Sequence, residues 1–566
     1  MNTSSTEVLI VGAGPVGLTC SILLSQLGVA NRVIERREGL HLSPQAHVIS
    51  GRSMEIFRAA GVDEVSLRAV SSAPTDIMGI EWTHTLAGPS LGRLNLATPE
   101  RTVKIFTLGP APFTNISQHR LEPILLQHAE KAGAPVDFCH DWQSMESAAD
   151  GVTSRVLDRA SGAVEEIHSR FLLGCDGAGS SVRRARGIDL QGPACLETWV
   201  NVHFKANLRD VVGDRPAVLY WHLDPEEPGI FIAHDIDSNW VYMAPYNQNA
   251  LTPEHFDEAT CRGMIERAIG TDHPFEFVSR ATWALSAEVA ERYGDGSTWL
   301  LGDAAHRFPP SGGLGLNTGL ADAFNLAWKV AAVCDKRAGI NLLATYELER
   351  RDIAIANTRV SLANHHKMTE VVAALDVPAE LDMVAAREQI RTLAAAPERA
   401  ARVQAAIENQ AEHFDTFGLD FGYSYERGAI VSDGTTHQEP ANIVTDYVPC
   451  TRPGSRLPHA WVHKGEALIS TLDLIDRRAP TLLTGDGGAA WRDAAEGMGI
   501  PVTMIGAHAA VRDPEGAWAA VREIADNGAL LVRPDGHVGW RAMGPSADAT
   551  AELHSALEQI LPQGNS

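Results

Sequence analysis

The hydrophobic pattern at the start of the chain predicts a strand, a turn, a helix and a second strand. Residues 8–11 are wholly apolar, which is typical of a buried parallel strand. Residues 19–27 have the apolar spacing of a helix that ends at Gly28, and residues 29–35 form a second strand-like run. Together these segments predict a βαβ unit of the usual length.

The pattern changes several times farther along the chain. Between residues 196 and 277, short alternating apolar and polar runs predict antiparallel strands with one exposed face. Residues 320–410 have helical spacing, and residues 411–450 lack clear periodicity. In the tail we expect strands at residues 479–484 and 502–505, helices around Trp491 and Trp518, and a hairpin at 530–540 with Pro534-Asp535-Gly536 as its turn.

Size and composition are those of a soluble globular protein. The 566 residues are 45% apolar and 21% charged, which suits three or four domains of roughly 150 residues each. The formal net charge of -24 argues against nucleic acid as a partner and against an anionic membrane surface, because both need a basic footprint. The chain has no apolar run of roughly 18 residues or more, so we expect no membrane span.

The cysteines predict a reducing compartment. All seven are scattered and none forms a C-x-x-C pair, so neither a disulfide framework nor a zinc site is expected. The first apolar run leads straight into a glycine-rich turn and has no basic segment before it, which argues against a signal peptide. We therefore expect a cytoplasmic protein.

A glycine-rich turn, Gly12-Ala13-Gly14-Pro15-Val16-Gly17, stands between the first strand and the helix. Its glycines allow a tight turn, close approach of a pyrophosphate, and packing of the helix on the strand, and the helix N-terminus adds free N–H groups. Glu35 ends the second strand about 20 residues later, where an acid that binds a ribose belongs. A turn without a ligand would leave Glu35 unexplained, so we expect a dinucleotide, with FAD and NAD both open.

A second acidic motif lies near the middle of the chain. Apolar residues 299–301 lead into Gly302-Asp303, which presents a carboxylate to a polyol, and residues 312–319 form a glycine-rich helix start. Such a helix N-terminus would stabilise an anionic reduced flavin by about 0.3–1 kcal/mol or more. A third motif, residues 174–179 around Asp176, also follows an apolar strand. Each motif alone would be a plain turn, but the three in this order favour a flavin.

With these motifs the chain resembles the class A flavoprotein aromatic hydroxylases, the para-hydroxybenzoate hydroxylase type. It is most similar to the phenol hydroxylase branch, which contains 2-hydroxybiphenyl 3-monooxygenase and 2,4-dichlorophenol 6-monooxygenase. The likeness covers nearly the whole chain and includes residues 533–541. It implies FAD, NADH or NADPH as a transient reductant, O2 as co-substrate, a homodimer, and hydroxylation of a phenol ortho to an existing hydroxyl group by a flavin C4a-hydroperoxide.

The implied fold is α/β, with a Rossmann-like FAD-binding domain of the glutathione-reductase type, an inserted antiparallel β-sheet substrate domain and a C-terminal thioredoxin-like domain. We expect the FAD-binding domain at residues 1–75, 101–195 and 278–370, and the substrate domain at 76–100 and 196–277. A helical connecting region is expected at 371–452, and the thioredoxin-like domain, without redox cysteines, at 453–566.

The resemblance also assigns residues to FAD. The glycine-rich turn would hold the pyrophosphate, Glu35 the adenosine ribose, and Asp303 the ribitol and pyrophosphate region. The full set of expected FAD contacts is Gly12, Gly14, Pro15, Gly17, Glu35, Arg36, Arg52, Gln118, Asp303, Pro309, Gly313, Leu314, Gly315, Leu316 and Asn317. A surface salt bridge is the alternative for Arg52.

Two positions depart from the family pattern. Gln45 stands where the family often has Arg or Lys, and Gly179 where the Asp-Gly-Ala motif usually continues with Arg or His. Both departures concern contacts at the edge of the cofactor, including the binding of the nicotinamide. Neither concerns FAD binding.

His47 is the candidate catalytic base. A phenol titrates near pH 10, so a base must take its proton near neutral pH, and imidazole suits that task. His47 opens the segment that matches the flavin-facing strand of relatives, where the branch has a histidine or an aspartate. The alternative is a structural histidine bonded to backbone.

An apolar pocket for the aromatic ring is expected from the antiparallel segment. Tyr220, Trp221 and Tyr242, with Pro310, are the candidates for substrate contact. Ordinary sheet core is the alternative for the three aromatic residues.

Other functions stay open at this point. They are a flavin-dependent halogenase or reductase on the same fold, and a non-catalytic dinucleotide-fold binding protein. The W-x-W-x-I-P motif of tryptophan-type halogenases is absent, and the Gly302-Asp303 motif argues against a mere binding protein. No metal-binding spacing stands out, so no metal is expected. Residues 88–92 match G-x-S-x-G but lack the strand and helix that a nucleophile elbow needs.

Overall fold

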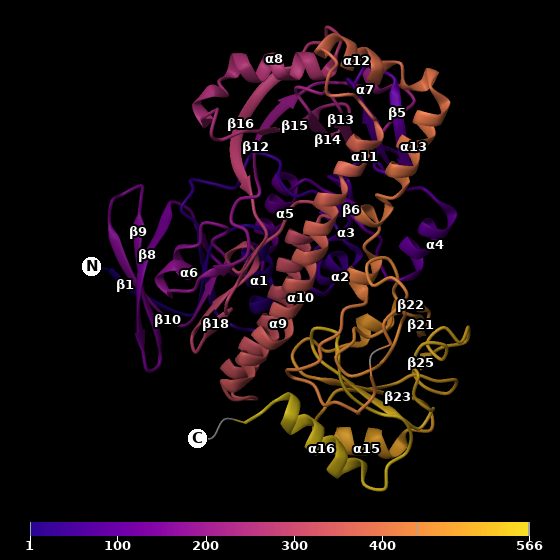
Figure 1. Ribbon diagram of the computed structural model, residues 1–566. Helices are drawn as coiled ribbons and strands as arrows, with labels where there is room; N and C mark the ends of the chain where they lie inside the picture. The colour runs from indigo at the N-terminus through magenta and orange to yellow at the C-terminus, as the bar shows by residue number, and fades with distance from the viewer. Residues whose placement is uncertain (1, 437, 564–566) are drawn as a thin grey trace.

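The computed structural model describes residues 2–436 and 438–563. Its α/β body is built on a mixed sheet in the order β18-β19-β10-β1-β2-β7, which β9 and β8 extend in antiparallel fashion (Figure 1). In chain order its strands are β1 (Asn2–Val11), β2 (Asn31–Ile34), β7 (Val136–Asp137), β8 (His140–Ala148), β9 (Gly151–Asp158), β10 (Val164–Gly174), β18 (Gly294–Asp295) and β19 (Thr298–Leu300). The four strands β2, β1, β10 and β19 run parallel, as buried apolar runs predict.

The predicted βαβ unit is confirmed. Helix α1 (Pro15–Gln26) connects β1 to β2 and begins four residues earlier than the sequence pattern indicated, directly after the glycine-rich turn. It packs between α5 (Gln118–Lys131) and α9 (Leu314–Cys334). The other helices of this body are α2 (Gly51–Ala59), α3 (Glu64–Ala69), α6 (Ser181–Ala185) and α10 (Asn341–Lys367).

A second, seven-stranded sheet lies above this body, with α8 (Glu258–Ile269) on its far side (Figure 1). Its order is β16 (Glu276–Leu285), β12 (Glu197–Lys205), β15 (Asn239–Tyr246), β14 (Gly229–Asp235), β13 (Leu219–His222), β4 (Gly79–Thr83) and β5 (Ser90–Asn95). All neighbours are antiparallel except β13 and β4. The alternating runs therefore predicted antiparallel strands correctly, although β16 continues past Phe277 to Leu285. The expected exposed face is wrong for β12, β14 and β15, because most of their positions are buried on both faces of the sheet.

Short elements complete the two bodies. Small sheets join β3 (Val48–Ile49) to β6 (Thr114–Asn115), and β11 (Leu190–Gln191) to β17 (Glu288–Ala290) and β20 (His306–Arg307). The helical stretch continues after α10 with α11 (Thr369–Ala374), α12 (Met383–Arg391) and α13 (Pro397–Glu408). Helix α13 packs on β5 of the second sheet. The remaining helices are α4 (Pro99–Thr107), α7 (Arg209–Val212) and α14 (Phe417–Phe421).

The C-terminal region forms a four-stranded sheet in the order β24-β23-β26-β27 and a three-stranded sheet in the order β22-β21-β25. The elements are β21 (Trp461–Lys464), β22 (Ala467–Ser470), β23 (Thr481–Thr484), α15 (Ala489–Gly497), β24 (Val502–Met504), β25 (Val511–Arg512), β26 (Ala529–Val532), β27 (Val538–Ala542) and α16 (Ala549–Ile560). The hairpin and the helix at Trp491 are confirmed. The helix expected around Trp518 is wrong, since turns occupy that segment.

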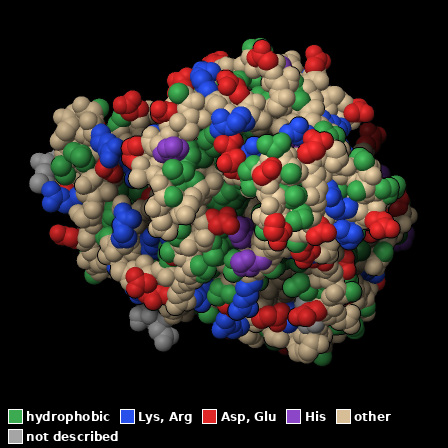
Figure 2. Space-filling model, turned by 45° about the horizontal axis from the view of Figure 1, so that its top comes forward, with side chains coloured by type: hydrophobic (Ala, Val, Ile, Leu, Met, Phe, Trp, Pro, Cys, Tyr) green, Lys and Arg blue, Asp and Glu red, His purple; other side chains and the backbone are tan. Residues whose placement is uncertain are grey.

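The molecule's surface carries charges of both signs. Among the described residues, no helix is long and apolar enough to cross a membrane. On the face drawn in Figure 2, Lys and Arg side chains are interspersed with Asp and Glu side chains.

Candidate active site

The three sequence motifs meet at one edge of the first sheet. Val11, Gly174 and Leu300 are paired across β1, β10 and β19, and Ile34 pairs with Val11 from the other side. The glycine-rich turn, Asp176, Asp303 and Glu35 therefore all follow the carboxyl ends of neighbouring parallel strands. This is where an open α/β sheet binds its ligands.

The glycine-rich turn leaves room for a ligand on one side only. Gly12 has φ +108°, and a Cβ there would lie 2.4 Å from the Cys175 carbonyl oxygen; a Cβ at Gly17 would lie 2.1 Å from the Gly12 oxygen. A Cβ at Gly14 would meet only open space. Within the described chain no side chain caps the first turn of α1, so its N–H groups are free for an anion. The turn therefore fits a pyrophosphate.

Asp303 is free to bind a ligand. It follows Gly302 in a single 3-10 turn, and its side chain is exposed. No hydrogen bond or ion pair engages its carboxylate anywhere in the described residues. By contrast, the Asp176 carboxylate accepts bonds from the Ser181 and Val182 N–H groups at 2.6 and 3.1 Å, so it caps α6. Asp303, and not Asp176, is thus the carboxylate available to a polyol.

The N-terminus of α9 is the second anion-binding position. Gly312 and Gly313 have φ +100° and +64°, and no side chain among the described residues caps the helix. A Cβ at Gly315 would meet open space. Asn317 is engaged by protein: its amide nitrogen donates to the carbonyls of Val48 and Gly313 at 3.0 and 2.7 Å. Leu314 is buried, and Leu316 packs partly exposed beside the core.

Of the other residues expected at FAD, Glu35, Arg36 and Gln118 bond to neighbours in the FAD-binding body or face solvent, whereas Arg52 contacts the C-terminal region. Glu35 is 7% exposed and accepts the Ala13 N–H at 3.1 Å, and Arg36 beside it is exposed. Gln118 begins α5 and donates to Glu122 at 2.8 Å. Arg52 is buried, so a surface salt bridge is excluded: it pairs with Glu55 at 3.0 Å and donates to the Asp535 carbonyl at 2.9 Å. Its guanidinium therefore faces the C-terminal region.

The two departures from the family pattern lie at the surface of the site. Gln45 is exposed, and its amide lies 3.4 Å from His41 Nε2. Gly179 is exposed, and a Cβ there would meet open space. Both positions are open to solvent in this structure.

His47 is partly exposed and precedes β3, whose Val48 would touch a Cβ at Gly313. Its Nδ1 lies 2.5 Å from the Asn115 amide oxygen. Nε2 makes no hydrogen bond within the described chain. Loss of water around the imidazole lowers the pKa of His47, because the charged form is less well solvated there. The hydrogen bond with Asn115 partly offsets that shift. The lowered pKa favours the neutral form of the ring, which lies between Asn115 and His234.

Sequence reasoning missed three more histidines: His234 contacts His47, and His119 and His203 interact with His234. The His234 ring meets the His47 ring edge to face at 5.3 Å between centroids. His203 Nε2 donates to the Asn239 amide oxygen at 3.0 Å, and the centroids of the His203 and His119 rings lie 6.1 Å apart. The alternation in β12 and β14 could have revealed two of them, because His203 and His234 alternate with residues of the apolar core. No metal-binding cluster occurs among the described residues.

The aromatic candidates lie on two different faces of the second sheet. Tyr220 and Tyr242 are 0% and 1% exposed and belong to the core beneath α8, where Tyr242 meets His222 at 2.9 Å. For these two the structure favours the alternative, a packed sheet core. Trp221 lies on the opposite face and stacks on Trp82, with 6.4 Å between the ring centroids. Pro309 is buried and Pro310 exposed just before α9, and the Pro310 carbonyl accepts the Gly313 N–H at 3.0 Å.

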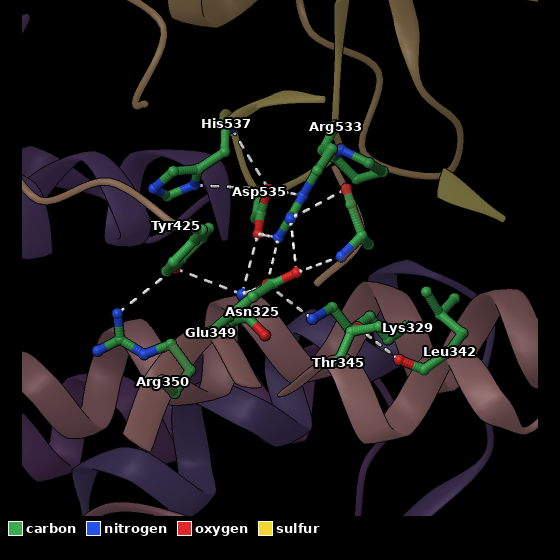
Figure 3. A network of polar contacts seen from close by, with 12 residues as sticks. Asn325, Lys329, Leu342, Thr345, Glu349, Arg350, Tyr425, Arg533, Asp535 and His537 are labelled. Carbon is green, nitrogen blue, oxygen red and sulfur yellow. Dashed lines mark hydrogen bonds and ion pairs between the residues drawn. The ribbon is translucent and has the colours of Figure 1, made fainter. Parts of the chain in front are cut away.

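A buried polar network connects the floor of this site to the C-terminal hairpin (Figure 3). Asp322 of α9 accepts from the Gly302 N–H at 3.2 Å, from His306 at 2.8 Å and from Arg350 at 2.8 Å. The adjacent Glu349 holds Lys329 and Arg533, each at 2.8 Å. In Figure 3, Arg350 donates to the Tyr425 hydroxyl, and Asn325 donates to both Tyr425 and Glu349. The network thus reaches from the Gly302-Asp303 turn to residue 533.

Two family models match the chain. One, described as an FAD binding domain, matches residues 5–361. The other, described as the C-terminal part of an aromatic-ring hydroxylase, matches residues 450–563.

Relatives align over almost the whole chain. It is 34% identical to 2,4-dichlorophenol 6-monooxygenase from Cupriavidus pinatubonensis, over 99% of this chain and 97% of that protein. It is 32% identical to tetracenomycin A2 monooxygenase-dioxygenase from Streptomyces glaucescens, over 99% and 98%. Among solved structures it is similar to the flavin-dependent monooxygenase PieE in complex with FAD and substrate, with a TM-score of 0.92, 33% identity and 99% of each chain covered. Because family models and full-length relatives agree, this chain belongs to the FAD-dependent aromatic-ring hydroxylases.

Proposed function

We propose that the enzyme hydroxylates a phenolic ring ortho to an existing hydroxyl group, with His47 as the base that removes the phenolic proton. NADH or NADPH reduces FAD, and O2 is the co-substrate. The observation that carries the proposal is the free Nε2 of His47, whose chain neighbour Val48 lies beside Gly313 at the N-terminus of α9. A phenolate ring is more electron-rich than a phenol, so taking this proton speeds attack by an electrophilic oxygen.

The chain's own residues divide the work at the site. Gly12, Gly14, Pro15 and Gly17 would hold the FAD pyrophosphate, Glu35 and Arg36 the adenosine ribose, and Asp303 the ribitol. The N-terminus of α9 would stabilise negative charge on a bound flavin, and the open space at Gly315 would allow the backbone to approach it closely. When bound and reduced, FAD supplies the activation of O2. Trp221 and Pro310 remain our candidates for substrate contact.

Stimulated turnover tests the function. Purified yellow protein is given NADH or NADPH with a panel of phenols, and O2 consumption and product mass are followed. We expect a phenol to accelerate NAD(P)H oxidation and to gain one oxygen atom as a catechol. A halogenated product would instead support the halogenase alternative, and reduction without oxygen insertion would support a reductase.

We further propose that residues 453–566, of which 564–566 lie outside the described part of the chain, form a thioredoxin-like domain with a structural role, and that the enzyme is a cytoplasmic homodimer. The strand order β24-β23-β26-β27, with α15 between β23 and β24, supports the domain assignment. No cysteine follows Cys450, so this domain has no thiol for disulfide exchange. The dimer and the location rest on the family resemblance and on the scattered cysteines. Light scattering of the purified protein tests the dimer.

A further inference from the structure

A directed chain of hydrogen bonds holds the ring of His47. The Ser72 hydroxyl donates to the carbonyl oxygen of His234 at 2.8 Å, so its oxygen is free to accept the bond from Asn115 Nδ2 at 2.7 Å. The Asn115 amide therefore turns its oxygen toward His47 Nδ1, 2.5 Å away. Because an amide oxygen only accepts, Nδ1 carries the proton and Nε2 is left with its lone pair.

The backbone fixes the same three residues. The Ser72 N–H donates to the Asn115 carbonyl at 2.9 Å, and the Ile116 N–H donates to the His47 carbonyl at 2.8 Å. Val48 and Asn115 are paired in the β3–β6 ladder. The amide of Asn115 is thus placed by main-chain contacts on both sides and does not depend on a substrate for its orientation.

We propose that Asn115 and Ser72 are positioning residues of the hydroxylation: they hold His47 as the Nδ1–H tautomer, and their lack of charge suits this base to the more acidic phenols. The inference rests on the function proposed above. Within the described part of the chain, the titratable residues around His47 include no carboxylate that is bonded to its ring. His234 from β14 contacts the ring, His119 from α5 and His203 from β12 lie beside His234, and Arg120 pairs with Asp235 at 3.3 Å.

No carboxylate pairs with His47 among the described residues, so nothing there stabilises an imidazolium strongly. For each pKa unit by which a phenol exceeds its base, the ionised fraction falls tenfold. Unsubstituted phenol, near pKa 10, is therefore a poor match for an uncharged, amide-supported imidazole. Phenols with chlorine or acyl substituents, which withdraw charge from the oxygen, ionise more readily at this base.

The test compares pH profiles of kcat/KM for a chlorinated phenol and for unsubstituted phenol. The variants are Asn115→Leu, Asn115→Asp and Ser72→Ala. Ser71→Ala is the matched control, because the Ser71 hydroxyl donates to the Arg68 carbonyl at 2.8 Å, outside this chain of bonds. FAD content and the rate of flavin reduction report whether each variant is folded and loaded.

The two substitutions of Asn115 should shift the acid limb of the kcat/KM pH profile in opposite directions. Asn115→Leu removes a bond that raises the pKa of His47, so the limb moves to lower pH while the plateau falls roughly 10-fold or more. Asn115→Asp places a carboxylate beside Nδ1, so the limb moves to higher pH and the preference for the chlorinated phenol narrows. Ser72→Ala should lower the plateau less than Asn115→Leu. Equal acid limbs in the Leu and Asp variants would overturn the proposal.

Nitrogen-15 NMR of the histidine-labelled, FAD-loaded enzyme reads the tautomer without any substrate. The His47 signals are identified by their loss in His47→Gln. We expect protonated Nδ1 and bare Nε2 in the wild type, and a mixture of tautomers in Asn115→Leu. A wild-type ring protonated at Nε2 would also overturn the proposal. If no phenol stimulates wild-type turnover, the proposed function fails, and these spectra still decide the tautomer.

Discussion

At the scale of single residues, the carboxylates at the sheet edge show which groups the fold reserves for a ligand. Asp176 and Asp322 are both saturated by protein donors, whereas Asp303 is exposed and unpaired within the described chain. A polar group left without a protein partner can bind a ligand without breaking a bond first. We therefore expect FAD retention to depend on Asp303.

We predict that Asp303→Ala gives folded but colourless protein, because the ribityl chain loses its polar anchor. The measurement is the ratio of flavin absorbance to protein absorbance after purification, with circular dichroism to confirm folding. Asp295→Ala is the control: its ion pair with Arg186 is exposed, so FAD content should stay at the wild-type level. Full FAD occupancy in Asp303→Ala would remove this residue from the cofactor site.

The residue scale also shows where sequence reasoning stops. Gly12, Gly14, Gly17 and Asp303 could be predicted because their spacing within one segment carries the signal. Asn115 could not, because its contact with His47 joins segments far apart in the chain.

At the scale of secondary-structure elements, α9 connects the proposed flavin site to the C-terminal region. The sequence predicted this helix from residue 320, but it begins at Leu314, since Gly313 in the left-handed region makes the turn into the helix. Its start carries Asn317, and its middle carries Asn325 and Lys329, which face the hairpin turn at residues 533–537. The hairpin was predictable from its Pro-Asp-Gly turn, but the partner of that turn was not, because ion pairing across the chain leaves no local pattern.

We predict that Arg533→Met destabilises the protein by about 3–5 kcal/mol, because it leaves Glu349 and Asp535 buried without their main cation. Arg533 is fully buried, with both terminal nitrogens 2.8 Å from the Glu349 carboxylate. Burial raises the pKa of Glu349, but Arg533 and Lys329 lower it to about 2. Thermal unfolding of the FAD-loaded variant measures the loss.

Arg512→Met serves as the control for this change, because Arg512 is exposed in the same region. It should alter stability by no more than about 0.5 kcal/mol. Equal unfolding temperatures for Arg533→Met and the wild type would mean that the network in Figure 3 contributes nothing net.

At the scale of the whole molecule, the C-terminal region shares its core with the FAD-binding body. Leu482, Trp491 and Leu531 lie in the same buried cluster as β1 and α9. The order of elements along the chain was predictable, because apolar periodicity is local. The order of strands in each sheet was not, since β1, β10 and β19 pair across more than a hundred residues of sequence.

We predict that truncation after Thr451 yields aggregated protein or an altered oligomeric state, because it exposes the part of the core that this region covers. Size-exclusion chromatography with light scattering measures the outcome, and full-length protein is the control. A soluble, fully active truncation with unchanged elution per subunit would show that the region is dispensable.

The account's central claim is that His47 takes the phenolic proton during hydroxylation. The most direct test is the amount of hydroxylated product per NAD(P)H oxidised, in wild type and in His47→Ala, across pH. We predict that His47→Ala retains FAD and its reduction but loses product by roughly 10²-fold or more, with O2 appearing as H2O2. Imidazole acts as a base only when it is neutral, and burial lowers the pKa of His47, so the acid limb of the wild-type profile should lie at lower pH than the titration of a free imidazole. A wild-type yield of product from His47→Ala would contradict the account.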